Sequence, residues 1–367
     1  MSKRIHLLVG TSKGVFMYVS DEERRQWSLK GPFLNGWEAY SVMGDSRGGT
    51  HRMFAGTSHA AYGATIRYSD DFGETWTQVE EGPRYAPETG FSLNRIWQLM
   101  PGAPSQPDTI YAGAEEAGLF VSRDRGATWR ELDALTKHPS RPNWFGGAGG
   151  LCLHTIIVDP HNEKRIWVAM SAVGVFRTED GGETWQTCNT GLNRAATGQQ
   201  DDSIGYCIHK MVISPTDPNT LYMQEHSGVF MSTDAGDTWT PIEEGLTLHG
   251  DDRPFGFPIA IAPNGDLFLI PLESSEKRSM LGGKLLVWSR RPGDTKWEPI
   301  GDVVPEELRH VSVLRDAMAI DSFEPYGLYF GTSSGEIFCS LDRGVTWSRL
   351  PGQLSRIMSV KPWIVEG

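Results

Sequence analysis

The chain has 367 residues, and its 46 acidic against 34 Lys and Arg side chains give a formal net charge of −12 at pH 7. This balance argues against a polyanionic partner, so we expect neither nucleic acid nor an acidic membrane surface as a ligand. No apolar run approaches the roughly 18 residues of a membrane span, and four scattered cysteines are too few for a secreted disulfide framework. We therefore expect a single domain over residues 1–367, located in the cytoplasm with reduced thiols.

The first predicted elements are short strands separated by turns. Residues 4–10 (RIHLLVG) and 14–20 (GVFMYVS) have the apolar, β-branched content of strands. A fuller set lies between residues 152 and 188, where four such segments indicate strands a, b, c and d of one sheet, counted from the inside. The N-terminal set lacks an a strand, which residues 355–362 near the C-terminus can supply. We expect this strand to join the N-terminal sheet and close a ring.

One motif, S/T-x-D-x-G-x-T-W, recurs between strands c and d. Five copies begin at Ser69, Ser122, Thr178, Ser232 and Ser340. Two degenerate copies end at Trp27 and Trp297, so the seven final tryptophans follow one another at intervals of 49 to 58 residues. Asp can hydrogen-bond backbone N–H groups of its own turn, and Gly accepts a positive φ. A repeat of this length predicts an all-β, seven-bladed β-propeller of four-stranded antiparallel blades.

The repeated motif resembles the Asp-box, or BNR repeat, of β-propellers. Such repeats are found in sialidases, xyloglucan-active glycoside hydrolases, sortilin-type receptors and photosystem assembly factors of the YCF48 type. The chain differs from a typical sialidase, because it has seven copies of the repeat and lacks an R-I-P tripeptide near its N-terminus. The resemblance implies either a glycosyl-hydrolase-like enzyme or a binding protein, since one fold carries many functions.

The candidate site comes from the a strands, aligned on the prolines that follow them. His154 and His209 each stand six residues before a proline in the related segments CLHTIIVDP and CIHKMVISP. The same offset selects Arg95, Arg356 and Phe257 in three other blades. Aligning AIDS with IVDP adds Asp316, and Tyr40 is the candidate in the remaining blade. Because most neighbouring positions are apolar, we expect these titratable side chains to meet in one central funnel.

Loops at the same end add further candidates. Turns between strands b and c carry His59, Glu115 and His226, and the long loop 141–150 carries Trp144, which can cover a ligand as an aromatic lid. Loops 193–202 and 249–256 are also long and lie at the predicted mouth.

Three functions are compatible with these residues. In the favoured one, an enzyme cleaves a small anionic, possibly glycosidic substrate by hydrolysis or elimination. Arg95 and Arg356 then bind the anionic group, assisted by Glu115, Trp144, His59 and His226. His154 or His209 serves as base, and Asp316 or Tyr40 as acid.

The second function is a non-catalytic binding or assembly-factor propeller. The third is a metal-dependent hydrolase or lyase, in which His154, His209, His59 and His226 are the candidate ligands of a divalent metal. Apart from this metal, we predict no cofactor. The expected partner is a small anionic or carbohydrate ligand, and the sequence makes no prediction of oligomeric state.

Overall fold

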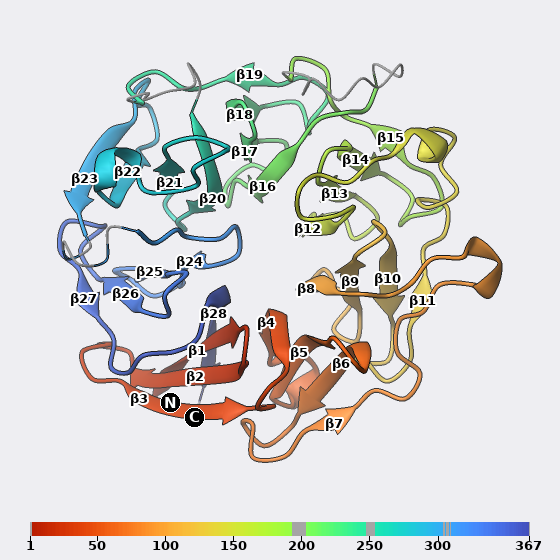
Figure 1. Cartoon of the computed structure of the whole chain (residues 1–367), viewed down its shortest axis with the longest axis horizontal. Coiled ribbons are helices and arrows are strands. Elements are labelled where there is room, and N and C mark those ends of the chain that lie inside the picture. The colour runs from red at the N-terminus through yellow and green to blue at the C-terminus, as the bar shows by residue number, and fades with distance from the viewer. Residues whose placement is uncertain are drawn as a thin grey trace.

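The computed structural model describes residues 2–192, 203–246, 254–303, 305, 308 and 310–366. Seven four-stranded antiparallel sheets are arranged as blades around a central axis, which confirms the predicted fold (Figure 1). Short 3-10 turns at Arg47–Gly49, Pro87–Thr89, Arg141–Asn143 and Leu281–Gly283 interrupt the connections. No helix among the described residues is long and apolar enough to cross a membrane.

Each blade is numbered here by its place in the ring, beginning with the blade that holds both termini. The strands, from the innermost outward, are β28 (Ile357–Glu366), β1 (Lys3–Thr11), β2 (Gly14–Asp21) and β3 (Ser28–Phe33) in blade one; β4 (Glu38–Asp45), β5 (Arg52–His59), β6 (Gly63–Ser69) and β7 (Thr77–Gln78) in blade two; β8 (Ile96–Pro101), β9 (Ile110–Ala114), β10 (Leu119–Ser122) and β11 (Arg130–Glu131) in blade three; β12 (Leu153–Val158), β13 (Ile166–Met170), β14 (Gly174–Thr178) and β15 (Gln186–Thr187) in blade four; β16 (Ile208–Ile213), β17 (Leu221–Glu225), β18 (Gly228–Ser232) and β19 (Thr240–Pro241) in blade five; β20 (Phe255–Ile261), β21 (Leu267–Leu272), β22 (Leu286–Arg290) and β23 (Glu298–Asp302) in blade six; β24 (Met318–Ile320), β25 (Leu328–Gly331), β26 (Ile337–Ser340) and β27 (Ser348–Arg349) in blade seven.

The C-terminal strand closes the ring as predicted. Strand β28 pairs antiparallel with β1 from Lys3 opposite Glu366 to Thr11 opposite Ile357. The two chain ends therefore lie side by side in blade one (Figure 1). This pairing covers the edge that β1 would otherwise expose.

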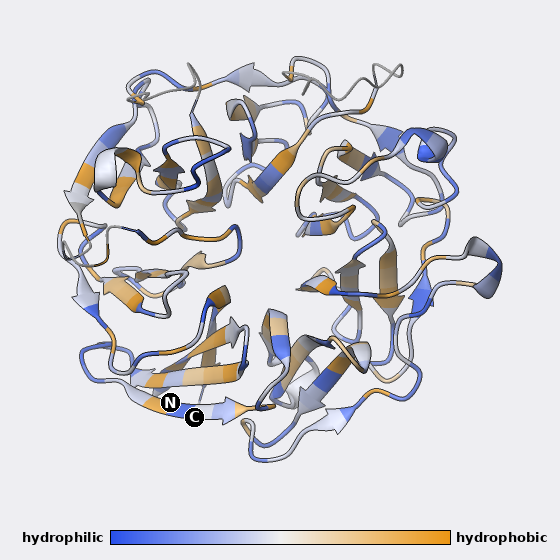
Figure 2. Ribbon diagram, in the orientation of Figure 1, coloured by the Kyte–Doolittle hydropathy of each residue, from blue (hydrophilic) through white to orange (hydrophobic). Residues whose placement is uncertain are grey.

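The core lies between neighbouring blades. All residues of β9, β10, β12, β13 and β14 are buried, whereas both residues of the outermost strand β27 are exposed. In Figure 2 the outer strand β11 is blue, while β10 in the same blade is largely orange. The four cysteines form no disulfide in this structure, and three of them are buried.

The repeated motif forms the turn that its residues predicted. In the first copy, the Asp71 carboxylate accepts hydrogen bonds from the backbone N–H of Thr75 (2.9 Å) and from its hydroxyl (2.6 Å). Gly73 has a φ of 93° and donates its N–H to Ser69 Oγ at 2.8 Å, and Trp76 Nε1 donates to the Gly73 carbonyl at 3.1 Å. The equivalent Asp–Thr and Gly–Ser/Thr bonds recur in the other four full copies.

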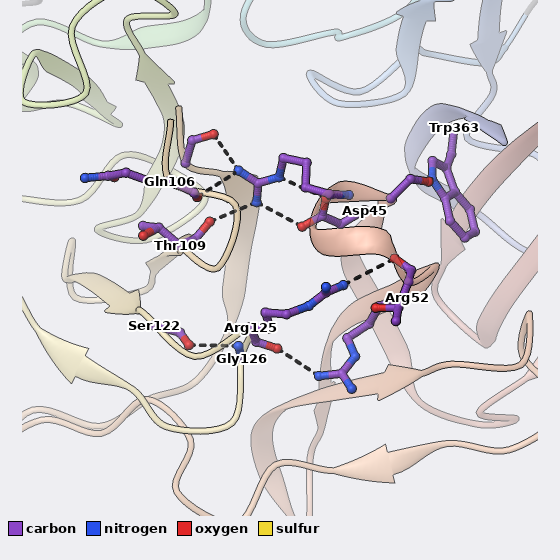
Figure 3. A network of polar contacts seen from close by, with 12 residues as sticks. Asp45, Arg52, Gln106, Thr109, Ser122, Arg125, Gly126 and Trp363 are labelled. Atoms are coloured by element: carbon purple, nitrogen blue, oxygen red, sulfur yellow. Dashed lines mark hydrogen bonds and ion pairs between the residues drawn. The ribbon is translucent and has the colours of Figure 1, made fainter. Parts of the chain in front are cut away.

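Arginines join one blade to the next, as Figure 3 shows for blades two and three. The Arg47 guanidinium is held by Asp45 at 2.9 Å and donates to the backbone carbonyls of Gly102 (2.7 Å) and Thr109 (2.9 Å). Arg52 Nη1 donates at 3.0 Å to the carbonyl of the next turn. Such links fasten neighbouring blades to each other through their connecting turns.

Candidate functional site

A β-bulge near the start of the inner strand positions the side chains of the central cavity. In the described part of the chain, six inner strands change register against their neighbour at this point. The residues left unpaired there are Met358, Tyr40, Trp97, His154 and His209, with Phe257 and Pro258 in blade six. A bulge re-aims a side chain without ending the pairing. Asp316, just before β24, takes the corresponding position in blade seven.

Five of these bulge residues and Asp316 line a cavity of about 380 Å³ at the centre of the ring; His154 and Pro258 do not. The cavity is within the usual size range of small-molecule sites. Backbone from Gly146 to Gly149 borders it, which shows that loop 141–150 reaches the mouth as predicted. Residues 193–202 and 249–253 of the other two long loops lie outside the described residues.

Three arginines give this cavity its charge: Arg278, Arg315 and Arg356 all line it. Within the described ranges, none of the three forms an ion pair with a carboxylate. The Arg315 guanidinium lies 5.4 Å from the ring centre of Trp97 and 5.9 Å from that of Phe257, so aromatic faces hold it toward the cavity. Unpaired guanidinium groups in a partly apolar cavity favour an anionic ligand.

Asp316 is neutralised by two lysines of other blades. Its carboxylate oxygen lies 2.6 Å from Lys210 Nζ of β16 and 3.1 Å from Lys361 Nζ of β28. Burial alone would raise the pKa of Asp316, but the two ammonium groups hold it well below its usual range. Burial lowers the pKa of Lys210 to about 8, while Asp316 acts in the opposite direction. Asp316 therefore stays ionised, which makes it unsuited to the predicted role of acid.

Tyr40 and His209 both line the cavity, and they differ in protonation: the tyrosine carries a proton that it can donate, and the histidine has a lone pair that can accept one. Burial raises the pKa of Tyr40, so its hydroxyl keeps its proton. The buried His209 ring donates Nδ1–H to the Gly256 carbonyl at 2.5 Å, which leaves the lone pair on Nε2. Burial, followed by the charge of Arg315, holds the pKa of His209 well below its usual value, so the ring is neutral.

A group of possible metal ligands lies beside His209. Cys207, His209 and His226 all line the cavity, and their ligand atoms lie within 4.8 Å of one another. Of the four histidines predicted as metal ligands, the structure therefore brings His209 and His226 together. Cys207 was not among the predicted residues, although it stands in the same Cys-x-His segment as His209.

His154 and Trp144 lie in the protein interior and not on the cavity wall. His154 is fully buried, and its Nε2 donates to the Ile208 carbonyl of the next blade at 2.9 Å. Trp144 is buried against Phe176, and its Nε1 donates to Ser140 Oγ at 2.9 Å. The lid position expected for Trp144 is occupied instead by the glycines that follow it.

Arg95, Glu115 and His59 also lie outside the lining of the cavity. Arg95 forms an ion pair with Glu115 at 2.8 Å, and its guanidinium lies 5.3 Å from the Tyr40 ring centre. It therefore contacts Tyr40, which lines the cavity, without lining the cavity itself. His59 packs against Trp37 and Tyr62, with ring centres at 5.2 and 4.8 Å. These side chains thus belong to the neighbourhood of the mouth.

The proline alignment was wrong for two of the seven blades. Trp97 and Met358, and not Arg95 and Arg356, occupy the level of His154 and His209. Arg356 nevertheless reaches the cavity from two residues earlier in the chain. Sequence reasoning missed several residues, namely Cys207, Arg278, Arg315, Lys210 and Lys361. Three of these lie within two positions of a predicted residue, and that proximity was the available signal.

Comparison with known proteins agrees with this architecture. A BNR/Asp-box repeat model matches residues 67–78. The chain is 26% identical over 168 residues to an oligoxyloglucan-reducing end-specific xyloglucanase of Emericella nidulans, which covers 44% of this chain and 19% of that protein. The chain thus spans about a fifth of the length of this curated relative.

Solved structures show the same fold at low sequence identity. The GH74 xyloglucanase of Xanthomonas campestris aligns with a TM-score of 0.57 at 18% identity over 86% of this chain and 45% of that one. A putative 6-phosphogluconolactonase of Bacteroides fragilis aligns with a TM-score of 0.58 at 11% identity over 99% and 98%. These matches show the β-propeller fold, and the seven blades of this chain carry five full copies of an Asp-box turn, the first of which matches the repeat model.

Proposed function

We propose that the central cavity binds an acidic saccharide and that the protein cleaves it as a glycoside-active propeller. The observation that carries this proposal is the set of three cavity arginines, Arg278, Arg315 and Arg356, without carboxylate partners among the described residues. A chain with a net charge of −12 has many carboxylates available to neutralise them. Guanidinium groups bind carboxylate, sulfate and phosphate through paired hydrogen bonds.

The aromatic side chains of the cavity support a sugar as the rest of the ligand. Tyr40 and Trp97 contact each other with ring centres 4.9 Å apart, and both line the cavity together with Phe257. Apolar ring faces can stack on the C–H faces of a saccharide, while the arginines bind its charged group. The relatives named as xyloglucanases act on carbohydrate, which supports the same class of ligand.

Tyr40 as acid and His209 as base are the groups we assign to cleavage. The protonated Tyr40 hydroxyl can donate, and neutral His209 can accept through Nε2. Hydrolysis by the usual glycosidase route needs two carboxyl groups flanking the bond. Among the described residues, the lining of this cavity supplies one, Asp316, which is engaged by Lys210 and Lys361. We therefore favour elimination from a uronic-acid glycoside, where an arginine offsets the charge of the carboxylate.

A binding experiment with acidic and neutral oligosaccharides tests the proposal. Hydrogen bonds to charged groups contribute about 1.5–3 kcal/mol. Arg356→Ala and Arg315→Ala should therefore each weaken binding of a uronic-acid oligosaccharide by roughly tenfold to a hundredfold. Arg25→Ala, at an exposed site away from the cavity, is the matched control. Equal binding of the neutral oligosaccharide, or unchanged affinity in both cavity variants, would overturn the proposal.

Product analysis separates cleavage from binding alone. Elimination leaves an unsaturated uronide that absorbs in the ultraviolet, and Tyr40→Phe should abolish its formation while leaving affinity within a few fold. If the wild-type chain binds the acidic oligosaccharide but yields neither unsaturated nor hydrolysed product, the protein is a binding propeller. This second function rests on the same three arginines.

A further inference from the structure

Cys207, His209 and His226 converge from two segments of blade five. Cys207 directly precedes β16, His209 is the second residue of that strand, and His226 is in the turn between β17 and β18. The backbone N–H of His226 donates to the Cys207 carbonyl at 2.9 Å, which fixes the turn against the strand. The thiol and imidazole atoms that can bind a cation lie within 4.8 Å of one another.

The two imidazole rings are held in defined orientations. Phe255 packs against both, with ring centres 5.1 Å from His209 and 5.1 Å from His226, and Phe257 lies 4.9 Å from His209. The hydrogen bond from His209 Nδ1 to the Gly256 carbonyl directs the Nε2 lone pair away from the backbone. Metal-binding histidines commonly have this arrangement, with the non-ligating nitrogen donating to a carbonyl.

From this geometry we propose that Cys207, His209 and His226 form a Zn²⁺ site with its fourth position open to the central cavity. Thiolate and imidazole are the ligands that Zn²⁺ prefers, and three protein ligands with an open position are typical of reactive zinc sites. Ligand atoms around tetrahedral Zn²⁺ are roughly 3.3–3.7 Å apart, given Zn–N and Zn–S bonds of about 2.0–2.3 Å. The cluster must therefore contract by up to about 1 Å when the ion binds.

Blade four contains the same segment without the third ligand. Cys152 and His154 correspond to Cys207 and His209, and Ser171 N donates to the Cys152 carbonyl at 3.1 Å as His226 N does to Cys207. The position of His226 is thus occupied by a serine. His154 Nε2 is occupied by the Ile208 carbonyl. The repeated segment therefore predicts one metal site in blade five and provides an internal control in blade four.

The zinc site shares His209 with the proposed cleavage step, but it does not share the arginines that bind the acidic saccharide. With an ion bound, His209 would no longer be the base, and a water at the open position would supply that function. The cation would then add positive charge next to Arg278 and Arg315, which line the same cavity. Removing the metal with a chelator tests whether the two sites act together, because the affinity for the acidic oligosaccharide is measured separately from metal binding.

Zinc binding by the full chain is the direct test. The protein is purified under reducing conditions, stripped with a chelator and titrated with Zn²⁺ against a chromophoric chelator. We expect about one equivalent to bind. Cys207→Ser and His226→Gln should each weaken binding roughly tenfold or more, whereas Cys152→Ser should match the wild type. Co²⁺ should give the sulfur-to-metal charge-transfer band of a thiolate ligand, and Cys207→Ser should lose it.

Protection of the Cys207 thiol from alkylation tests the site in the wild-type chain, so it does not depend on a variant that folds. In the wild-type chain, Zn²⁺ should slow alkylation of Cys207 relative to Cys188 and Cys339, as followed by peptide mass spectrometry. Absence of stoichiometric Zn²⁺ binding, unchanged affinity in His226→Gln, or a cobalt spectrum without the thiolate band would each overturn the site.

Discussion

Replacement of Asp316 by Asn tests whether this carboxylate ties three blades together. In the folded protein it is the shared partner of Lys210 and Lys361, whose side chains are 10% and 29% exposed. Removing one partner of a buried ion pair typically costs about 3–5 kcal/mol, because the remaining charge stays uncompensated. A chain of 367 residues has an unfolding entropy of roughly 0.8 kcal/mol/K. We therefore expect Asp316→Asn to lower Tm by about 4–6 °C at pH 7.

The pH dependence of this loss follows from the two pKa shifts. The pKa of Lys210 in the folded protein is depressed to about 8, so this lysine loses its proton, and with it the attraction to Asp316, as the pH rises through 8. The Tm difference between the wild type and Asp316→Asn should therefore shrink from pH 7 to pH 9. The pKa of Asp316 is depressed too, so its contribution is present above about pH 4 and is lost as the pH falls below that value.

Calorimetry on the wild type, Asp316→Asn and the exposed control Glu74→Gln measures these effects. Glu74→Gln should leave Tm within about 1 °C. A similarly small change in Asp316→Asn at pH 7, or a difference that grows toward pH 9, would refute the structural role. Asp316 would then have to be reconsidered as a residue that acts on the ligand.

Two further predictions concern the fold. Gly113→Ala places a Cβ 2.5 Å from the Leu153 carbonyl oxygen of the next blade, so we expect a destabilisation of about 1–3 kcal/mol, seen as a lower Tm. In the control Gly82→Ala the nearest atom to the new Cβ is 3.6 Å away, and the Tm should change little. Thr184→Val removes the hydroxyl that donates at 2.6 Å to Asp180. Burial raises the pKa of Asp180, but this and other hydrogen bonds lower it to about 2. In Thr184→Val, a carboxyl titration followed by NMR should therefore give a higher pKa for Asp180, and acid unfolding should begin at a higher pH than in the wild type.

Fold and ring closure were predictable because the turn motif is local. Asp71, Gly73 and Thr75 make their hydrogen bonds within seven residues of chain, so the pattern of letters already contains the geometry. Even the degenerate copies retained a tryptophan at the expected interval. The missing a strand of the first blade was recognised in the same way, since only a segment near the C-terminus remained to pair with β1.

The register of the cavity was only partly predictable, because it depends on where each bulge falls. Prolines gave a common reference for β12, β16 and β20, each of which ends two residues before its proline. In β8, by contrast, Pro101 is the last residue of the strand, and in β28 Pro362 lies within it. A fixed offset therefore reached Arg95 and Arg356 at a different height. Partners such as Lys210 and Asp316, 106 residues apart, leave no local signal.

The bulges separate the stability of the ring from the chemistry of its centre. The residue just before the bulge is buried and apolar in five blades: Ile357, Ala39, Ile96, Leu153 and Ile208. The bulge residue itself differs widely, from methionine to histidine, because its backbone is released from the ladder and, in five blades, its side chain lines the cavity; His154 is instead packed against the next blade. A substitution at Tyr40 or Trp97 can thus change what the cavity binds, whereas His209 also donates to the Gly256 carbonyl of the next blade. The arginines favour anionic ligands locally, since a low-dielectric cavity lined by positive charge concentrates them, whereas the net charge of −12 opposes their approach at long range.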